Sequence, residues 1–310
     1  MTGVVTDLRV GAIPPPPAEP GPDAQAAVLQ AMADAGCDHL VVGDHVCFFG
    51  GWGVDGLVEA TALSMLHPAL PVHTSVYLLV LRHPVVVARQ ISTLALRAPG
   101  RLVLGVGIGG EDRDEVRACS VDPSTRGRRM DDCLAVLRPL LAGSTVDHAG
   151  EFFSLSSVSI RPAPPAPVPV VVGGRSTAAV HRAGRFGDGW LGIWVSPERF
   201  AAATSEAEAE AAEAGRGEVD WQHGMTVWCG VADDRSSATE AVSRAMEGVY
   251  GLPFERFARY VPAGTPADVA EALRPYVEAG CRTFNLLTQS PDPSMIPGAV
   301  GEVRRLLATA

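Results

Sequence analysis

The chain has 310 residues, a formal net charge of −10 and 47% hydrophobic residues. Its length allows one large domain or two ordinary ones, since α/β barrels commonly exceed about 200 residues as one domain. The acidic balance without a basic cluster excludes an ordinary nucleic-acid-binding surface, and no apolar stretch reaches the roughly 18 residues needed to span a membrane.

The cysteine and histidine spacings favour neither a metal site nor a disulfide framework. The six cysteines form no C-x-x-C pair, and the eight histidines form no H-E-x-x-H motif. All 25 basic residues are arginine, which is typical of a GC-rich genome such as that of an actinobacterium. The N-terminal segment lacks the basic start and apolar run of a signal peptide, so we expect a cytoplasmic protein.

Short runs rich in Val, Ile and Leu alternate with helical patterns along the chain. Continuous apolar runs indicate strands buried on both faces, as in a parallel sheet. The predicted strands are 8–13, 38–42, 72–79, 101–106, 168–172, 189–194, 225–231 and 282–288. The predicted helices are 22–36, 84–100, 127–142, 176–187 and 196–215, followed by three more after residue 235.

Strands that alternate with helices in this number predict a single (β/α)8 TIM barrel domain over residues 1–310. The segment 143–167 is long enough for an excursion before the fifth strand. A doubly wound sheet with a second domain is the alternative, but no linker-like change of composition supports it.

The stretch 101–115, RLVLGVGIGGEDRDE, places Gly105, Gly107 and Gly110 in the spacing G-x-G-x-x-G. This spacing is the dinucleotide fingerprint of a Rossmann fold, which normally opens the first strand–helix unit. Here the glycines follow the fourth predicted strand, and the acidic residue at the right distance, Asp131, falls within a predicted helix. We therefore expect a loop at the mouth of a barrel.

Several segments in combination resemble the luciferase-like monooxygenases. They are LVVGDHV at the end of the second strand, HTSVYLLVLRHPVVVARQISTLAL, GRLVLGVGIGGEDRDEVRACSVDPSTRGRRMDDCLAVLRPLLAG and PVVVGGRSTAAVHRAGRFGDGW. The resemblance runs from about residue 8 to 308 and implies a bacterial-luciferase-like (β/α)8 barrel. It also implies a cofactor that is either the deazaflavin coenzyme F-420 or FMN.

Three features favour coenzyme F-420. His45 resembles the active-site histidine of deazaflavin-dependent sugar-phosphate dehydrogenases, and the GC-rich composition suits hosts that make the deazaflavin. The segment Thr74-Ser75-Val76 resembles the third-strand bulge of that branch, which implies a cis peptide between Ser75 and Val76 behind the ring. The chain departs from that branch at Glu111, which comes one place later than the corresponding glutamate, and at Phe49, which stands where that branch has a tryptophan.

The resemblance implies roles for four polar residues. His45 would donate or accept a proton during hydride transfer, with a structural histidine at a strand end as the alternative. Glu111 is a second candidate for proton transfer. Asp44 would orient His45 or contact the cofactor, with helix capping as the alternative. Trp194, after the sixth strand, would line the pocket or belong to the core.

Glycine-rich segments are the candidate cofactor contacts. Gly173, Gly174, Arg175 and Ser176 follow the fifth strand and open a helix, where backbone N–H groups can hold a phosphate. The alternative there is a turn with a serine cap. Gly107 and Gly109 would let the ring or its side chain approach the backbone, or would form a plain tight turn.

The sequence thus predicts an oxidoreductase that moves hydride between coenzyme F-420 and an unidentified small organic substrate. A two-component monooxygenase that uses reduced FMN is the alternative, and a flavin-binding barrel without catalysis is a second alternative. We expect a homodimer, with a flavin or deazaflavin reductase supplying reduced cofactor.

Overall fold

The computed structural model describes residues 7–110 and 112–309, so Glu111 of the expected site lies outside the described residues. The chain divides into two compact units. The first unit comprises Met1–Val41, Leu191–Ser205 and Gln222–Ala310, and the second comprises Val42–Trp190 and Glu206–Trp221. One domain over residues 1–310 stays a prediction.

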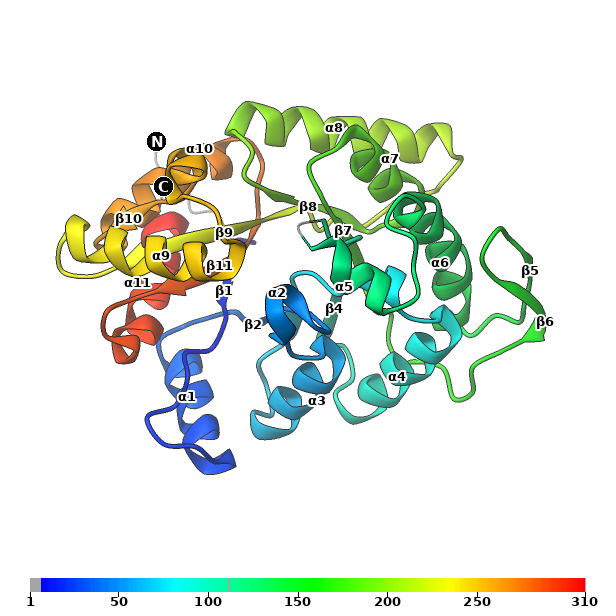
Figure 1. The fold of residues 1–310 in the computed structure, drawn as a ribbon, viewed down its shortest axis with the longest axis horizontal. Helices are drawn as coiled ribbons and strands as arrows, with labels where there is room; N and C mark the ends of the chain where they lie inside the picture. The colour runs from blue at the N-terminus through cyan, green and yellow to red at the C-terminus, as the bar shows by residue number, and fades with distance from the viewer. Residues whose placement is uncertain (1–6, 111, 310) are drawn as a thin grey trace. The chain divides into compact units, whose positions relative to one another are not determined.

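The first unit holds the N-terminal and C-terminal strand–helix repeats (Figure 1). Its strands pair in parallel, β1 with β11, β11 with β9, and β8 with β9. Its elements are β1 Arg9–Ala12, α1 Pro22–Asp34, β2 His39–Val42, β8 Gly189–Ile193, α8 Pro197–Glu213, β9 Gly224–Val231, α9 Arg235–Tyr250, β10 Ala263–Gly264, α10 Pro266–Glu278, β11 Thr283–Gln289 and α11 Ile296–Ala308; β2, β8 and α8 each cross the boundary between the units.

The second unit carries the middle of the chain, and its strands β3, β4 and β7 also pair in parallel. Its elements are α2 Phe48–Gly51, α3 Gly56–Leu66, β3 Val72–Thr74, α4 Pro84–Arg97, β4 Leu102–Val106, α5 Arg113–Ala118, α6 Arg126–Leu141, β5 Val146–Ala149, β6 Ser154–Val158, β7 Val170–Gly173 and α7 Thr177–Phe186.

The fold is a (β/α)8 barrel, built from β1, β2, β3, β4, β7, β8, β9 and β11. Each predicted strand corresponds to one of these, which confirms the predicted fold class. The third strand is shorter than predicted: it ends at Thr74, and the chain continues into a bulge and a 3-10 helix at Leu79–Leu81. The charged segment 112–119, which was not among the predicted helices, contains the short helix α5.

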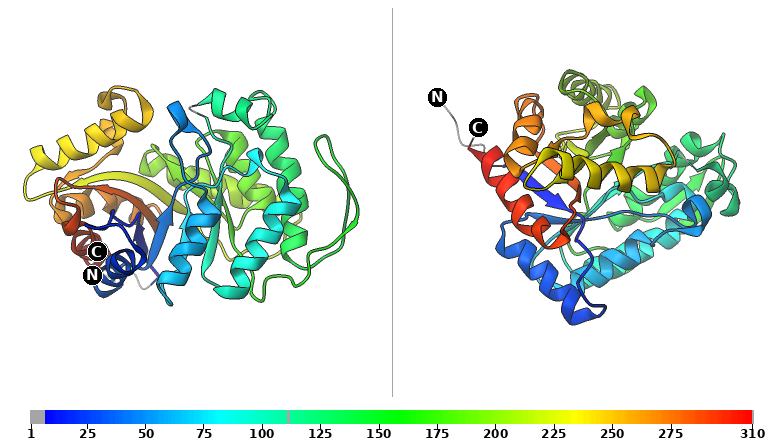
Figure 2. Two further views of the ribbon diagram at one scale, coloured as in Figure 1. Left: turned by 60° about the horizontal axis from the view of Figure 1, so that its bottom comes forward. Right: turned by 60° about the vertical axis from the view of Figure 1, so that its left-hand side comes forward.

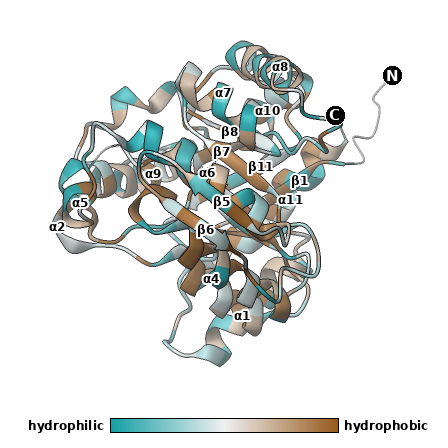
Figure 3. Cartoon of the chain, turned by 90° about the vertical axis from the view of Figure 1, so that its right-hand side faces the viewer, coloured by the Kyte–Doolittle hydropathy of each residue, from teal (hydrophilic) through white to brown (hydrophobic). Residues whose placement is uncertain are grey.

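The core follows the apolar runs of the strands. All eight residues of β9 and all five of β4 are buried, as two-sided burial requires. Hydrophobic colour is concentrated in such strands, among them β7 and β11, whereas α8 shows bands of both colours (Figure 3). Among the described residues, no helix has both the length and the apolar character needed to cross a bilayer.

The predicted excursion before the fifth barrel strand is an antiparallel hairpin, β5–β6, that stands beside α6 (Figure 2). The His148 imidazole lies 2.5 Å from the Asp132 carboxylate of α6, and Arg128 pairs with Glu151 across the same junction. The hairpin thus contacts α6 through polar side chains at both places.

Gly105 in β4 permits the close approach of β3. A Cβ atom at this position would lie 2.0 Å from the carbonyl oxygen of Thr74. The hydroxyl of Thr74 in turn donates a hydrogen bond of 2.7 Å to the carbonyl of Gly105. A backbone oxygen cannot yield as a flexible side chain can, so this glycine is required by packing and not by a nucleotide.

We expect Gly105→Ala to destabilise the protein by about 1–3 kcal/mol, the usual cost of forcing extra volume into a packed interior. Gly110→Ala is the matched control from the same stretch, since a Cβ there meets nothing within 4 Å. Thermal unfolding of both variants checks this, and equal midpoints would contradict the steric role of Gly105.

Candidate active site

The candidate site lies wholly in the second unit, where β2 ends. His45 follows this strand, and its Nδ1 lies 3.0 Å from Oε2 of Glu115 in α5. The Glu115 side chain is only 3% exposed, and its Oε1 accepts the backbone N–H groups of Val46 and Cys47 at 2.6 and 3.2 Å. When the Glu115 carboxylate is ionised it only accepts hydrogen bonds, so Nδ1–H is then the donor and Nε2 is left for chemistry.

Helix α5 is held in place by Asp112 at its start. One carboxylate oxygen of Asp112 accepts the N–H groups of Asp114 and Glu115, and the other accepts the N–H of Phe49 at 2.8 Å. Burial acts to raise the pKa of Asp112, but these three N–H donors outweigh it and leave the pKa below its ordinary value. Asp112 therefore joins the helix that carries Glu115 to the loop after His45.

The Asp44 side chain is buried, and its hydrogen-bond partners lie inside the protein. Its carboxylate accepts the N–H groups of Gly56 and Leu78 at 2.9 and 2.8 Å, and both terminal nitrogens of Arg82 at 2.5 and 2.8 Å. Arg82 also reaches Asp55 at 3.1 Å. Burial raises the pKa of Asp44, and Arg82 works against that rise. The side chain of Asp44 is 0% exposed, so a direct cofactor contact through its carboxylate is not available. Its bond from the N–H of Gly56, the first residue of α3, fits the helix-capping alternative, and the orientation of His45 stays a prediction.

The bulge after β3 fills the space beside two glycines. The peptide between Ser75 and Val76 is cis, as the sequence resemblance implied. A Cβ atom on Gly107 would lie 2.3 Å from a methyl group of Val76, and one on Gly173 would lie 2.8 Å from the other methyl group. Because Val76 is half-exposed and Gly107 is buried, a ligand at this surface would meet Val76 and not Gly107. Gly109 has a φ of +63°, as a tight turn requires.

The segment after β7 has the features of an anion-binding helix start. Gly174 has a φ of +132°, and its carbonyl accepts the indole N–H of Trp190 at 2.7 Å. The Ser176 hydroxyl caps α7 by accepting the N–H of Ala179, and the first turn of α7 holds no acidic side chain. Arg175 and Ser176 are exposed. The serine cap agrees with the alternative of a capped turn, and a phosphate also fits this helix start, because N–H groups at a helix start and the helix dipole favour an anion.

The structure therefore brings His45, Asp44 and the Ser75–Val76 bulge into one unit with the segment 173–176. Sequence reasoning missed Glu115 and Arg82. A signal for Glu115 was present, since Asp112-x-x-Glu115 has the spacing of a helix N-terminus. In this helix the Glu115 carboxylate contacts His45 and the N–H groups of Val46 and Cys47.

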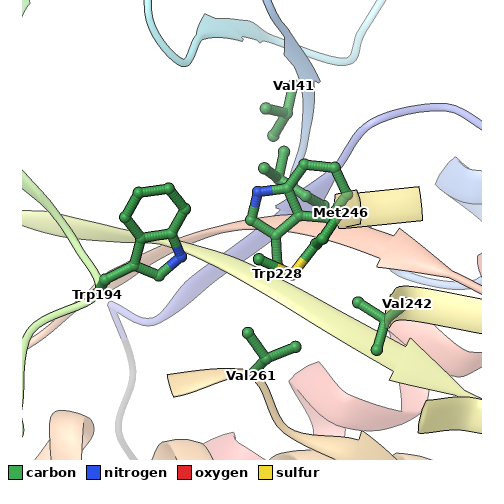
Figure 4. Close-up of a cluster of buried hydrophobic side chains, with 7 residues drawn as sticks. Val41, Trp194, Trp228, Val242, Met246 and Val261 are labelled. Atoms are coloured by element: carbon green, nitrogen blue, oxygen red, sulfur yellow. The ribbon is translucent and has the colours of Figure 1, made fainter. Parts of the chain in front are cut away.

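Trp194 lies in a cluster of buried hydrophobic side chains in the first unit, which also holds Trp228 and Met246 (Figure 4). Trp194 is 9% exposed, and its ring centroid lies 4.6 Å from that of Phe257 and 5.3 Å from that of Tyr250. The indole N–H of Trp228 donates to the Tyr250 hydroxyl at 3.1 Å. Trp194 thus belongs to a packed core, one of its two expected roles.

The remaining titratable groups do not meet the requirements of a metal site in the part of the chain that the structure describes. No three His, Cys, Asp or Glu side chains gather there as metal ligands would. His39 is buried and lies 2.7 Å from the Asn285 amide oxygen, and burial lowers its pKa to about 4. It therefore stays neutral at physiological pH.

With this geometry in view, comparison with known proteins gives the family. The family model described as luciferase-like monooxygenase matches residues 1–261. The chain belongs to this family. The resemblance found in its segments is thus confirmed.

This chain matches about half the length of one relative and most of the length of another. An uncharacterised protein of Mycobacterium tuberculosis is 34% identical over 138 residues, which is 44% of this chain and 47% of that protein, so the chain spans about half of it. The F420-dependent glucose-6-phosphate dehydrogenase of Kineococcus radiotolerans is 29% identical over 280 residues, 80% of this chain and 81% of that protein.

A solved structure supports the fold. An F420-dependent secondary alcohol dehydrogenase in complex with an F420–acetone adduct superposes with a TM-score of 0.83. The superposition covers 97% of this chain and 99% of that chain, at 20% sequence identity. At this identity the likeness establishes the barrel and nothing about the substrate.

Proposed function

We propose that this luciferase-like protein is an oxidoreductase that transfers hydride between coenzyme F-420 and a small organic substrate. The observation that carries the proposal is the buried Glu115 beneath His45 at the end of β2. Glucose-6-phosphate dehydrogenases that depend on F420 are among its relatives over most of its length, which supports the choice of cofactor.

The residues of the second unit fit a phosphate-bearing deazaflavin. Gly173, Gly174, Arg175 and Ser176 would hold its phosphate at the start of α7, and the half-exposed bulge at Ser75 and Val76 would support the ring. When bound, the deazaflavin supplies a carbon centre that accepts or gives up a hydride.

His45 would handle the proton. With Nδ1 bound to Glu115, Nε2 accepts the hydroxyl proton when an alcohol is oxidised and returns it when a carbonyl is reduced. The carbinol carbon meanwhile loses one hydrogen with two electrons to the cofactor, so the alcohol becomes a carbonyl and the charges balance. Glu115 keeps the imidazole in one orientation and one tautomer. Glu111 remains a second proposed proton-transfer residue.

Titration of the protein with coenzyme F-420 and with FMN tests the cofactor. We expect quenching of fluorescence that saturates with the deazaflavin, and Arg175→Ala to weaken that binding. Tight FMN binding without deazaflavin binding would overturn the proposal in favour of the FMN-dependent monooxygenase. Binding without turnover over a broad panel of alcohols and carbonyl compounds would favour a barrel without catalysis.

We further propose a cytoplasmic homodimer that receives reduced cofactor from a separate reductase. Exposed apolar side chains on neighbouring helices support a self-association surface: Val58 and Met65 on α3 are 66% and 53% exposed, and Val86 on α4 is 56% exposed.

A further inference from the structure

Exposed hydrophobic side chains concentrate in the loop that follows His45. Val46, Phe49, Trp52 and Val54 are 47%, 49%, 60% and 45% exposed. We call residues 46–54 the apolar loop. Exposed apolar groups gathered in one short segment indicate a surface that binds something apolar.

The apolar loop is held in this form by hydrogen bonds. Phe48 and Trp52 exchange backbone bonds of 2.8 and 3.0 Å, and the N–H of His45 donates to the carbonyl of Val54 at 3.0 Å. The carboxylates of Asp112 and Glu115 accept further N–H groups from the loop. The exposure of its aromatic rings is therefore a property of an ordered segment.

The aromatic rings of the loop surround the imidazole. The ring centroid of His45 lies 4.0 Å from that of Phe48 and 6.0 Å from that of Trp52. Phe48 is buried and forms the floor, whereas Trp52 is exposed. A molecule that reaches His45 along this loop must therefore contact an aromatic surface.

The apolar loop itself carries no cation for a phosphate. Residues 42–58 contain no lysine or arginine. Arg82, the guanidinium that bonds to this region, is committed to Asp44 and Asp55. Recognition of a sugar phosphate normally relies on charged donors of the Arg or Lys type.

We propose that the apolar loop binds the reacting molecule, and that this molecule is a neutral, mainly hydrocarbon secondary alcohol or its ketone. The proposal rests on the proposed hydride transfer and adds the chemical class of the substrate. Trp52 sets the preference for apolar groups, while His45 exchanges the hydroxyl proton and the carbinol hydrogen leaves as hydride to the deazaflavin.

The test measures binding and turnover separately. Binding of 2-butanone, 2-hexanone and cyclohexanone to the protein without cofactor is measured by calorimetry, and kcat/KM is measured with the matching alcohols and with glucose 6-phosphate in the presence of coenzyme F-420. We expect affinity to rise about fourfold per added methylene, and glucose 6-phosphate to be a poor substrate.

The variant Trp52→Ala should weaken ketone binding and lower kcat/KM about tenfold, whereas Trp52→Phe should retain most of both. Leu96→Ala, which removes an exposed apolar side chain of α4 outside the loop, is the matched control and should change neither.

Each contrary outcome is distinct. Ketone binding that depends on Trp52 without any deazaflavin-dependent turnover would sink the proposed function and leave the apolar site standing. Preferred turnover of glucose 6-phosphate, or ketone affinity that is unchanged in Trp52→Ala, would overturn the substrate class. If Trp52→Ala lost only its affinity for coenzyme F-420, the loop would bind the cofactor. If it lost only its self-association, the loop would bind a second copy of the chain.

Discussion

Replacing His45 by glutamine is expected to lower kcat of the deazaflavin-dependent reaction by roughly 10²- to 10⁴-fold, the usual contribution of a positioned acid or base. Glutamine keeps a polar side chain at this position but cannot exchange a proton from Nε2. Because the proposed cofactor contacts lie at other residues, the affinity for coenzyme F-420 should stay at the wild-type value. Steady-state kinetics and fluorescence titration measure the two quantities.

Two further variants make this result specific. His181→Gln changes a half-exposed histidine that pairs with Glu206 on the surface, and it should leave kcat unchanged. Glu115→Gln should lower kcat less than His45→Gln, because an amide can still accept a bond from Nδ1. Wild-type turnover by His45→Gln would assign the proton to another group.

Arg82→Met is expected to lower the free energy of unfolding by about 3–5 kcal/mol, because removal of one partner leaves a buried carboxylate without its counter-charge. Asp44 would then keep only the N–H donors of Gly56 and Leu78. Denaturant unfolding at constant pH measures the loss, and the double variant Asp44→Asn with Arg82→Met should recover part of it.

Arg128→Met provides the contrast. Its partner Glu151 lies on the surface, and the two side chains are 62% and 51% exposed, so we expect no measurable change in stability. If Arg82→Met unfolds at the same denaturant concentration as Arg128→Met, the pair with Asp44 does not support the loop that carries His45.

The strands were predictable because they are buried on both faces and therefore lack polar interruptions. The third strand shows where that signal fails. Residues 75–79 are as apolar as the strand before them, yet the regular strand ends at Thr74, and Tyr77 keeps a single bridge to Val106. Between them, Val76 fills the space beside Gly107 and Gly173. Periodicity carries no information about such a contact, since the three residues lie far apart in sequence.

The candidate site was predictable only where the chain resembles a known pattern. His45 and the Ser75–Val76 bulge follow from that resemblance, but Glu115 and Arg82 do not. Glu115 lies in a helix of six residues within a charged stretch, which carries too little apolar periodicity to predict. Arg82 directly follows an apolar run, and its partner Asp44 lies 38 positions earlier, so no local pattern indicates the pair.

The contact of Val76 with two separate glycines has an evolutionary consequence. A mutation that adds a side chain at either Gly107 or Gly173 would collide with a methyl group of Val76, and only a smaller residue at position 76 would remove the collision. Among descendants of a common ancestor, these three positions should therefore change together or not at all. Gly107 and Gly173 would then be inherited together with Val76, although Val76 belongs to no glycine motif.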